Sequence, residues 1–284
     1  MSVIVATSLH SALQALDNAP EATVLAGGTD LMVELNSGHR RAVSVIAINR
    51  VAELRSWSYD PAAGLVHIGA GITYDEIARE PIAQWVPALA QAARTVGSPQ
   101  IRHAATIGGN LGTCSPAGDG LPVLAALDAT VHLASLGGTR SLTFGDYMLG
   151  PKRTARRHGE LITGVTVPVI RGWQGYSKVG VRNAMVIAVA SAALVADADS
   201  KSVRIALGSV GPTILRCPDA EAFAAARVDF AARSVSDVTV GQFSALVREA
   251  ARPIDDHRSS AEYRRHAVGV LAGRLLRRAF PNVD

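Results

Sequence analysis

Two pairs of adjacent glycines, Gly27-Gly28 and Gly108-Gly109, constrain the folding of this chain more than any other feature of its sequence. The first pair follows a short apolar run, residues 22–25, which predicts a buried strand, and a short predicted helix comes after it. Glycine permits a sharp turn and a close approach of the backbone to a ligand. Successive backbone N–H groups in such a turn can point at one phosphate oxygen. The first pair therefore predicts either an anion-binding turn or a plain strand-to-helix connection.

The second pair lies in a long segment, residues 97–119, which is dense in Gly, Ser, Thr and Pro and shows little apolar periodicity. We expect a functional loop here, because long loops inside a compact domain usually carry function. Thr106 stands two residues before this glycine pair and adds a hydroxyl donor, as Thr29 does directly after the first pair. Two anion-binding turns suit a ligand with two phosphates. Neither turn matches G-x-G-x-x-G, which disfavours a Rossmann-type nicotinamide site.

The remaining pattern predicts an α+β chain with a boundary near residues 168–172. Before this boundary, strands are expected at residues 44–48, 65–68 and 130–135, and helices at residues 9–19, 31–35, 72–78, 82–96 and 121–127. Thr73 with Glu76 forms a capping-box pattern at the start of one helix. After the boundary we expect a three-stranded meander over residues 175–180, 185–196 and 203–210, and then helices over residues 220–227, 240–251 and 260–279.

Composition excludes several classes of protein. The chain of 284 residues is 48% apolar, enough for a compact globule. Its Lys and Arg are spread along the chain without interleaved aromatics, which disfavours nucleic-acid binding. No run of about 18 apolar residues predicts a membrane span, and the N-terminus lacks the pattern of a secretory signal, so we expect a cytoplasmic protein. Cys114 and Cys217 are too few for an iron–sulfur or zinc site, so such a centre would need a partner chain.

Four segments, in order over almost the whole chain, are LAGGTDLM (residues 25–32), VGSPQIRHAATIGGNLGTCSPAGD (96–119), GYSKVGVRNAMVIAVA (175–190) and DDHRSSAEYRRHAV (255–268). They closely resemble the FAD-binding subunit of the molybdenum hydroxylases, the family of the carbon monoxide dehydrogenase medium subunit and the xanthine dehydrogenase FAD subunit. The resemblance implies an FAD-binding domain of the vanillyl-alcohol oxidase/PCMH type over residues 1–170, with α/β lobes at about 1–55 and 56–170. It also implies a small C-terminal domain of the carbon-monoxide-dehydrogenase flavoprotein type over residues 171–284, built of a three-stranded antiparallel sheet and helices.

The resemblance further implies which residues hold FAD. On one side of its pyrophosphate it places Val24, Leu25, Ala26, Gly27, Gly28, Thr29, Asp30 and Leu31, and on the other side Thr106, Ile107, Gly108, Gly109 and Asn110. No metal ligand and no catalytic residue is expected on this chain.

Four further residues receive individual roles from the resemblance. Thr113 and Asp119 correspond to contacts with the ribityl chain and the adenosine ribose, whose hydroxyls a carboxylate can accept from. Ile162 corresponds to an apolar contact beside the adenine. Lys178 corresponds to a cation near the flavin ring, which would favour reduced flavin. Two plainer interpretations stay open, namely an Asx turn at Asp119 and a solvated strand lysine at Lys178.

The implied function is electron transfer. A partner's molybdenum centre oxidises the substrate, and a small subunit's [2Fe–2S] clusters pass electrons to FAD on this chain and on to NAD, a quinone or another acceptor. The expected assembly is a dimer of heterotrimers. Three alternatives are a stand-alone flavin oxidoreductase, a flavin-binding scaffold and a plain nucleotide-binding protein. We expect His103 to pack its loop and Cys114 to be a structural thiol, whereas residues 152–157 form either a solvated loop or a partner-facing patch.

Overall fold

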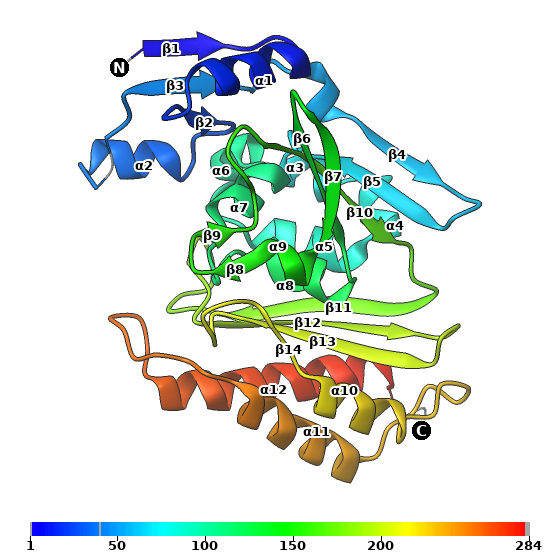
Figure 1. Ribbon diagram of the computed structural model, residues 1–284. Coiled ribbons are helices and arrows are strands. Elements are labelled where there is room, and N and C mark those ends of the chain that lie inside the picture. The colour runs from blue at the N-terminus through cyan, green and yellow to red at the C-terminus, as the bar shows by residue number, and fades with distance from the viewer. Residues whose placement is uncertain (1, 40, 282–284) are drawn as a thin grey trace.

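The computed structural model describes residues 2–39 and 41–281, and it begins with a small parallel sheet in the order β1-β3-β2 (Figure 1). The strands are β1 (Ser2–Val5), β2 (Thr23–Leu25) and β3 (Ser44–Ala47), and helices α1 (Leu9–Asn18) and α2 (Leu31–Asn36) connect them. Helix α1 begins at Ser8, whose side chain accepts a hydrogen bond from the backbone N–H of Ser11 in a capping box. The predictions for β2, β3, α1 and α2 are confirmed within a residue or two, whereas β1 was not predicted.

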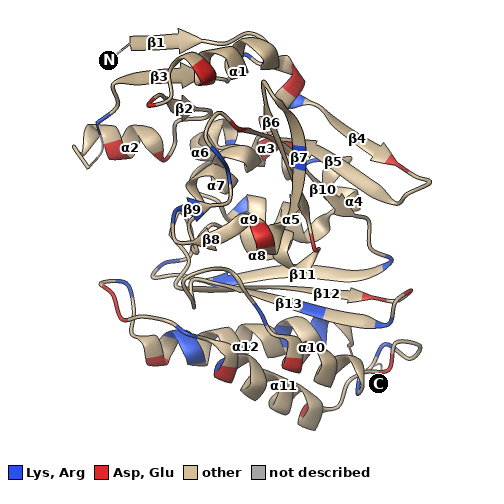
Figure 2. Ribbon diagram, in the orientation of Figure 1, with Lys and Arg blue, Asp and Glu red and all other residues tan. Residues whose placement is uncertain are grey.

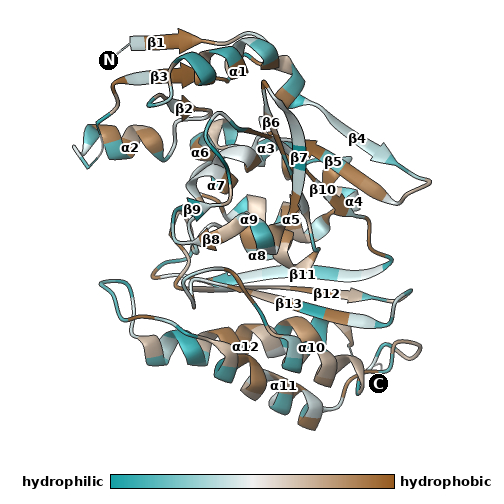
Figure 3. Ribbon diagram, viewed as in Figure 1, coloured by the Kyte–Doolittle hydropathy of each residue, from teal (hydrophilic) through white to brown (hydrophobic). Residues whose placement is uncertain are grey.

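The second sheet is antiparallel, with five strands in the order β4-β5-β10-β6-β7. The strands are β4 (Trp57–Asp60), β5 (Leu65–Gly69), β6 (Thr130–Ser135), β7 (Gly138–Thr143) and β10 (Leu161–Pro168). Strands β5 and β6 were predicted and the other three were not. Figure 3 shows β3, β5 and β10 as hydrophobic, in keeping with their burial.

Short helices fill the space beside this sheet. They are η1 (Ala52–Arg55), α3 (Tyr74–Ile77), α4 (Ile82–Trp85), α5 (Pro87–Thr95), α8 (Gly120–Ala126) and α9 (Phe144–Tyr147), and a hairpin of β8 (Met148–Gly150) and β9 (Arg153–Thr154) follows them. The capping box of Thr73 and Glu76 is confirmed at α3. The single helix expected over residues 82–96 is wrong, because Pro87 has no N–H to continue α4 and instead occupies the first turn of α5.

The expectation of a long loop at residues 97–119 is also wrong. The segment contains α6 (Pro99–Ala104) and α7 (Ile107–Thr113), which begin after the side-chain caps Ser98 and Thr106. The glycines that argued against a helix are tolerated because α7 is packed into the core, where Ile107 and Leu111 are fully buried. Tertiary packing has overridden a poor local helix propensity.

The third sheet has four antiparallel strands in the order β11-β12-β13-β14, which corrects the expected three-stranded meander. The strands are β11 (Gly172–Val179), β12 (Ala190–Asp197), β13 (Ser202–Gly208) and β14 (Leu215–Arg216). A strand of two residues shows no recognisable period, so β14 could not be predicted. The strand expected over residues 185–196 begins only at Ala190, and residues 180–189 form an irregular segment.

The three helices expected after this sheet are present as α10 (Pro218–Ala225), α11 (Asp237–Ala250) and α12 (Ala261–Ala279), and they cover its outer face (Figure 1). Strand β12 is buried on both faces, because Ala193 and Val195 join the core of the first two sheets while Ala192 and Leu194 join the core under α10–α12. Within residues 2–39 and 41–281, no helix is long and apolar enough to cross a membrane. Figure 2 shows Lys and Arg interspersed with Asp and Glu along the chain.

Candidate functional site

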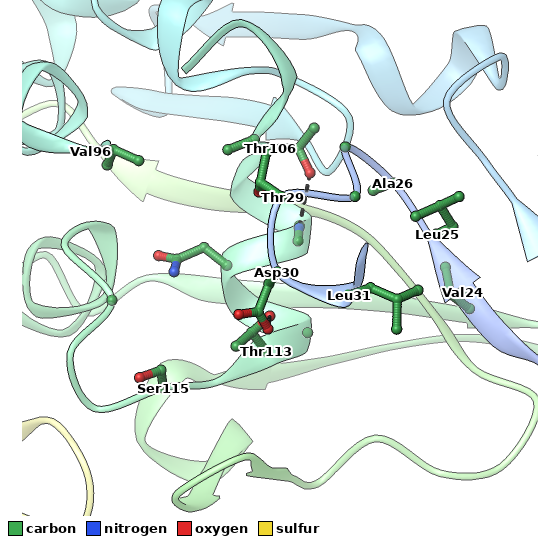
Figure 4. A pocket seen from close by; sticks show the side chains of 18 of the residues that line it. Val24, Leu25, Ala26, Thr29, Asp30, Leu31, Val96, Thr106, Thr113 and Ser115 are labelled. Atoms are coloured by element: carbon green, nitrogen blue, oxygen red, sulfur yellow. Dashed lines mark hydrogen bonds between the residues drawn. The ribbon is translucent and has the colours of Figure 1, made fainter. Parts of the chain in front are cut away.

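A cavity of about 580 Å³ lies where the β2–α2 connection meets α7 and the segment after it. Its volume is within the range of pockets that hold small molecules and cofactors. Figure 4 shows Thr29 of the first sheet's connection beside Thr106, and Asp30 facing Thr113. The hydroxyl of Thr113 donates to the Asp30 carboxylate at 3.0 Å, so the two walls are joined directly.

The structure brings together nearly all the residues predicted to hold FAD. Those that line the cavity are Val24, Leu25, Ala26, Gly27, Gly28, Thr29, Asp30, Leu31, Thr106, Gly108, Gly109, Asn110, Thr113, Asp119 and Ile162. Two predicted residues do not line it. Ile107 is fully buried in the core, and Lys178 lies behind Asp119.

The two glycines of each pair meet different surroundings. A Cβ on Gly27 would lie 1.8 Å from the carbonyl oxygen of Ala104, and a Cβ on Gly108 would lie 2.7 Å from that of Ala70. A Cβ on Gly109 would meet only the Thr106 hydroxyl, at 3.1 Å, whereas one on Gly28 would lie 3.2 Å from the Met32 side chain, and Gly28 adopts a φ of +73° that favours glycine. All four glycines line the cavity, and the first of each pair also permits close packing of two backbones.

The backbone donors of the first glycine segment are free to bind a ligand. Among the described residues, none accepts a hydrogen bond from the backbone N–H of Gly27, Gly28, Thr29 or Asp30. Four successive unpaired donors at a cavity wall suit an anion with several oxygens.

The second glycine segment differs, and it is not the anion-binding turn that the sequence suggested. The N–H of Ile107 donates to Ile72, that of Gly108 to Ala70, and that of Gly109 to the Thr106 hydroxyl. These first donors of α7 are already paired within the protein. The segment therefore offers a smooth glycine surface and the Asn110 side chain.

A buried ion pair lies at one end of the cavity. The Lys178 ammonium contacts the Asp119 carboxylate at 2.6 Å, and each side chain is only 9% exposed. Tyr176 donates to the other carboxylate oxygen at 2.7 Å, and Lys178 also donates to the carbonyls of Thr95 and Val186. Burial raises the pKa of Asp119, and the neighbouring Lys178 and Tyr176 act in the opposite direction.

This pair changes what the two residues can do. The Asp119 side chain caps no backbone group of α8, which argues against an Asx turn, and Lys178 is not a solvated lysine. The resemblance placed Asp119 at the adenosine ribose and Lys178 near the flavin ring, at opposite ends of FAD. Two residues in contact cannot lie at the two ends of an extended FAD, so the two predicted roles are not compatible with each other.

Tyr74 was not predicted from the sequence, although it lines the cavity. Its hydroxyl donates to Oδ1 of Asn110 at 2.6 Å, and burial strongly raises the pKa of this phenol. With Oδ1 occupied, the amide nitrogen of Asn110 is left as its donor group. No local motif marks Tyr74, because its role depends on a partner 36 positions away.

Further lining residues came from segments interpreted otherwise. Met185, Val186 and Ile187 belong to the segment expected as a strand, and Lys152 and Arg156 belong to the basic cluster at residues 152–157. The positive charges of that cluster were the sequence feature that could have indicated these two residues, since both border the cavity.

Two residues of the second glycine segment remain outside the site, as expected. His103 is exposed, and its Nδ1 lies 2.9 Å from the carbonyl oxygen of Pro99, so it packs on its own helix. Cys114 is fully buried, and burial raises the pKa of its thiol to about 11, so it stays protonated near neutral pH.

The cavity fits FAD in chemistry as well as in size. Unpaired N–H groups at residues 27–30 suit the diphosphate. Apolar side chains also line the cavity, among them Ile48, Val96, Ile101, Leu161, Ile162 and Ile187. A ligand that combines a diphosphate with aromatic rings matches this lining.

Comparisons with known proteins agree with this geometry. The glyceraldehyde dehydrogenase medium chain of Sulfolobus acidocaldarius is 33% identical over 95% of this chain and 95% of its own length. The carbon monoxide dehydrogenase medium chain of Hydrogenophaga pseudoflava is 28% identical over 92% of this chain and 90% of its own. The structure of carbon monoxide dehydrogenase from the same organism, lacking the Mo-pyranopterin moiety, superposes with a TM-score of 0.87 at 26% identity, covering 98% of this chain and 96% of that one.

Family matches cover both parts of the chain. Residues 176–279 match the C-terminal domain of the carbon monoxide dehydrogenase flavoprotein, and residues 1–170 match the FAD-binding domain in molybdopterin dehydrogenase. The expected family is confirmed: the chain belongs to the FAD-binding flavoprotein subunits of the molybdopterin-dependent hydroxylases.

Proposed function

We propose that this chain carries FAD as the electron-transfer subunit of a molybdenum hydroxylase complex. The observation that carries the proposal is the run of four unpaired backbone N–H groups, Gly27 to Asp30, at the wall of a cofactor-sized cavity. Flavin, when bound, supplies one- and two-electron transfer, and the protein supplies binding, orientation and exclusion of solvent.

The diphosphate is held, in this proposal, between residues 27–30 and the glycine surface of α7. The Thr29 hydroxyl and the Asn110 amide add side-chain donors, the latter oriented by Tyr74. Ile162 lies at the adenine end. We assign Asp119 to the flavin end, on the ribityl side. Its partner Lys178 is also bonded to Val186, so the irregular segment 180–189 is assigned to the same end.

Lys178 then acts through Asp119. Its ammonium is paired with a carboxylate, so the pair is close to neutral and attracts a reduced flavin less than an unpaired lysine would. Its role in this proposal is to keep Asp119 ionised and oriented so that the carboxylate can accept from ribityl hydroxyls.

The proposal of a larger complex is supported by two relatives that are named medium chains. We propose that a small subunit with [2Fe–2S] clusters delivers electrons and that a large subunit with the molybdenum cofactor oxidises the substrate, as a dimer of heterotrimers in the cytoplasm. The chain is organised for this as α/β lobes at about 1–55 and 56–170, with residues 171–284 as the C-terminal domain.

The test is to purify the full chain, add FAD, and record its visible spectrum after gel filtration. We expect a flavin spectrum, release of the flavin by acid, and no flavin reduction by aldehydes, purines or carbon monoxide. Failure to retain FAD would overturn the proposal. Substrate-dependent reduction by the isolated chain would instead favour a stand-alone flavin oxidoreductase.

A further inference from the structure

Arg264 lies on α12, outside the cavity, yet its side chain is tied to a cavity wall. The side chain is 4% exposed, and its guanidinium donates to acceptors from three different segments. These are the carbonyl oxygens of Val189 and Ser209, both at 2.9 Å, and a carboxylate oxygen of Asp256 at 2.6 Å. A planar guanidinium can hold several acceptors in fixed directions, which the single nitrogen of lysine cannot do.

Val189 ends the irregular segment 180–189, which supplies Met185, Val186 and Ile187 to the cavity. Apart from its ends this segment is loosely packed, since Met185 is 54% exposed and Ile187 is 51% exposed. Its position therefore depends on a few bonds, namely those at its base and the one from Lys178 to the carbonyl of Val186.

Ser209 extends the same connection to a second wall. Its hydroxyl donates to the carbonyl of Ala188 at 2.9 Å, and its backbone N–H donates to the carbonyl of Pro116 at 2.9 Å. Pro116 stands between two cavity-lining residues, Ser115 and Ala117. Arg264 and Ser209 thus join the C-terminal helix to both segments at this end of the cavity.

Asp256 completes the arrangement. Its carboxylate also accepts from the backbone N–H groups of Arg258 and Ser259, and it is the carboxylate bonded to Arg264. The buried cation is therefore balanced by one fixed anion and two backbone carbonyls, and its Nε alone has no partner among the described residues.

We propose that Arg264 is a positioning residue for the flavin end of the cavity: through Val189 and Ser209 it holds segments 180–189 and 115–117 at the distance that the cofactor requires. The inference rests on the proposed function. It also assigns a task to helix α12 beyond covering the third sheet.

The experiment compares the full-length wild type with Arg264→Met and Arg264→Lys. Arg265→Met is the matched control, because Arg265 is the exposed neighbour on the same helix. Phe243→Leu is the stability control, because Phe243 is fully buried on α11 and touches neither segment. Amide hydrogen exchange is measured without FAD, and FAD affinity is measured by quenching of flavin fluorescence.

For Arg264→Met we expect amide exchange in residues 180–189 to become at least about tenfold faster. Without the bonds from Arg264, the local opening of this segment becomes more favourable. FAD affinity should fall by about tenfold, and iodide should quench the bound flavin more strongly, since loss of charge-assisted hydrogen bonds loosens the wall. Arg264→Lys should restore part of each effect. Arg265→Met should match the wild type, and Phe243→Leu should lower the melting temperature without changing exchange in residues 180–189.

Unchanged exchange in residues 180–189 together with unchanged FAD affinity in Arg264→Met would overturn the inference. If that variant does not fold, Ser209→Gly replaces it, because Ser209 has a φ of +63° that glycine accepts and the change removes only the bond to Ala188. Its effects should be smaller and in the same direction, and their absence would likewise overturn the inference. A wild type that fails to bind FAD refutes the proposed function, whereas the exchange comparison still tests the role of Arg264.

Discussion

Gly108 and Gly109 are neighbours in the sequence, but a side chain at each would meet different atoms. At Gly108 it would collide with the Ala70 backbone, so Gly108→Val should lower the free energy of unfolding by about 1–3 kcal/mol through overpacking. Loss of FAD from that variant would therefore be uninformative. Gly109 is the better test of the cavity assignment.

Gly109→Val should leave the melting temperature close to that of the wild type, because a Cβ at this position would meet only the Thr106 hydroxyl. Its branched side chain would occupy the wall against which the diphosphate is proposed to lie, so FAD affinity should fall at least about tenfold, or about 1.4 kcal/mol. Gly241→Val on α11 is the control and should bind FAD normally, because a Cβ at Gly241 would have no neighbouring atom within 4 Å. Normal binding by Gly109→Val would show that FAD lies elsewhere.

The residues predictable from the sequence were those whose constraint is local. A glycine pair indicates that another group lies close to the backbone, whether that group is a ligand or a second backbone segment. Both pairs therefore led to the cavity, even though only the first provides free backbone donors. Asp119 and Lys178 were found individually, but their contact spans 59 positions and no local pattern could reveal it. Tyr74 escaped notice for the same reason.

At the scale of elements, the basic cluster at residues 152–157 proves to be an organised connection into β10. Glu160 holds it together, because its carboxylate accepts two hydrogen bonds from Arg140, at 2.6 and 2.9 Å, and one from the backbone N–H of Arg157. Arg140 also binds the carbonyl of Ala155. The segment that carries Arg156 to the cavity is thereby fixed.

Glu160→Gln should lower the free energy of unfolding by about 2 kcal/mol at pH 7, since bonds to a charged group are lost from a buried site. Arg140 is the main cause of the lowered pKa of Glu160, so folding favours the ionised form. The stabilisation is complete above the ordinary value of 4.5 and is lost as the pH falls through the lower folded pKa. Denaturant unfolding at several pH values should show the two proteins converging in acid. Asp199→Asn, in an exposed pair with Arg171, should change little at any pH, and a similar loss there would contradict the argument.

Elements with their own capping signals were predicted best, as at Thr73 for α3. Helix α7 was missed because its glycines have poor helix propensity and its stability comes from burial of Ile107 and Leu111. Strands β4 and β7 carry little apolar signal, since most of their residues are exposed or half-exposed at the two edges of the second sheet. Local pattern therefore lost both edges of the second sheet, and it missed the central strand β10 as well.

At the scale of the whole molecule, the third sheet joins two cores. Strand β12 contributes alternate side chains to each, so the C-terminal domain is continuous with the cofactor domain through a shared layer. The order of the parts was predictable from the pattern and the family resemblance. The sharing of β12 between two cores was not predictable, because the sequence of a strand that is buried on both faces does not show which elements cover it.

FAD should therefore leave a footprint on the segments that border the cavity and on little else. At a free concentration of 100 times its Kd, a ligand stabilises the native state by about 2.7 kcal/mol. For amides that exchange through local opening, protection should be concentrated in residues 22–31, 96–119, 152–162 and 185–187, which border the cavity. Helices α10 and α11 pack on the far side of the third sheet and should not change.

Riboflavin, which lacks the diphosphate, should protect residues 184–189 far more than residues 26–31, because the unpaired N–H groups of Gly27 to Asp30 are proposed to bind phosphate oxygens. Short-time hydrogen exchange with each ligand makes the comparison, and an FAD footprint that omits residues 26–31 would contradict the assignment of the diphosphate.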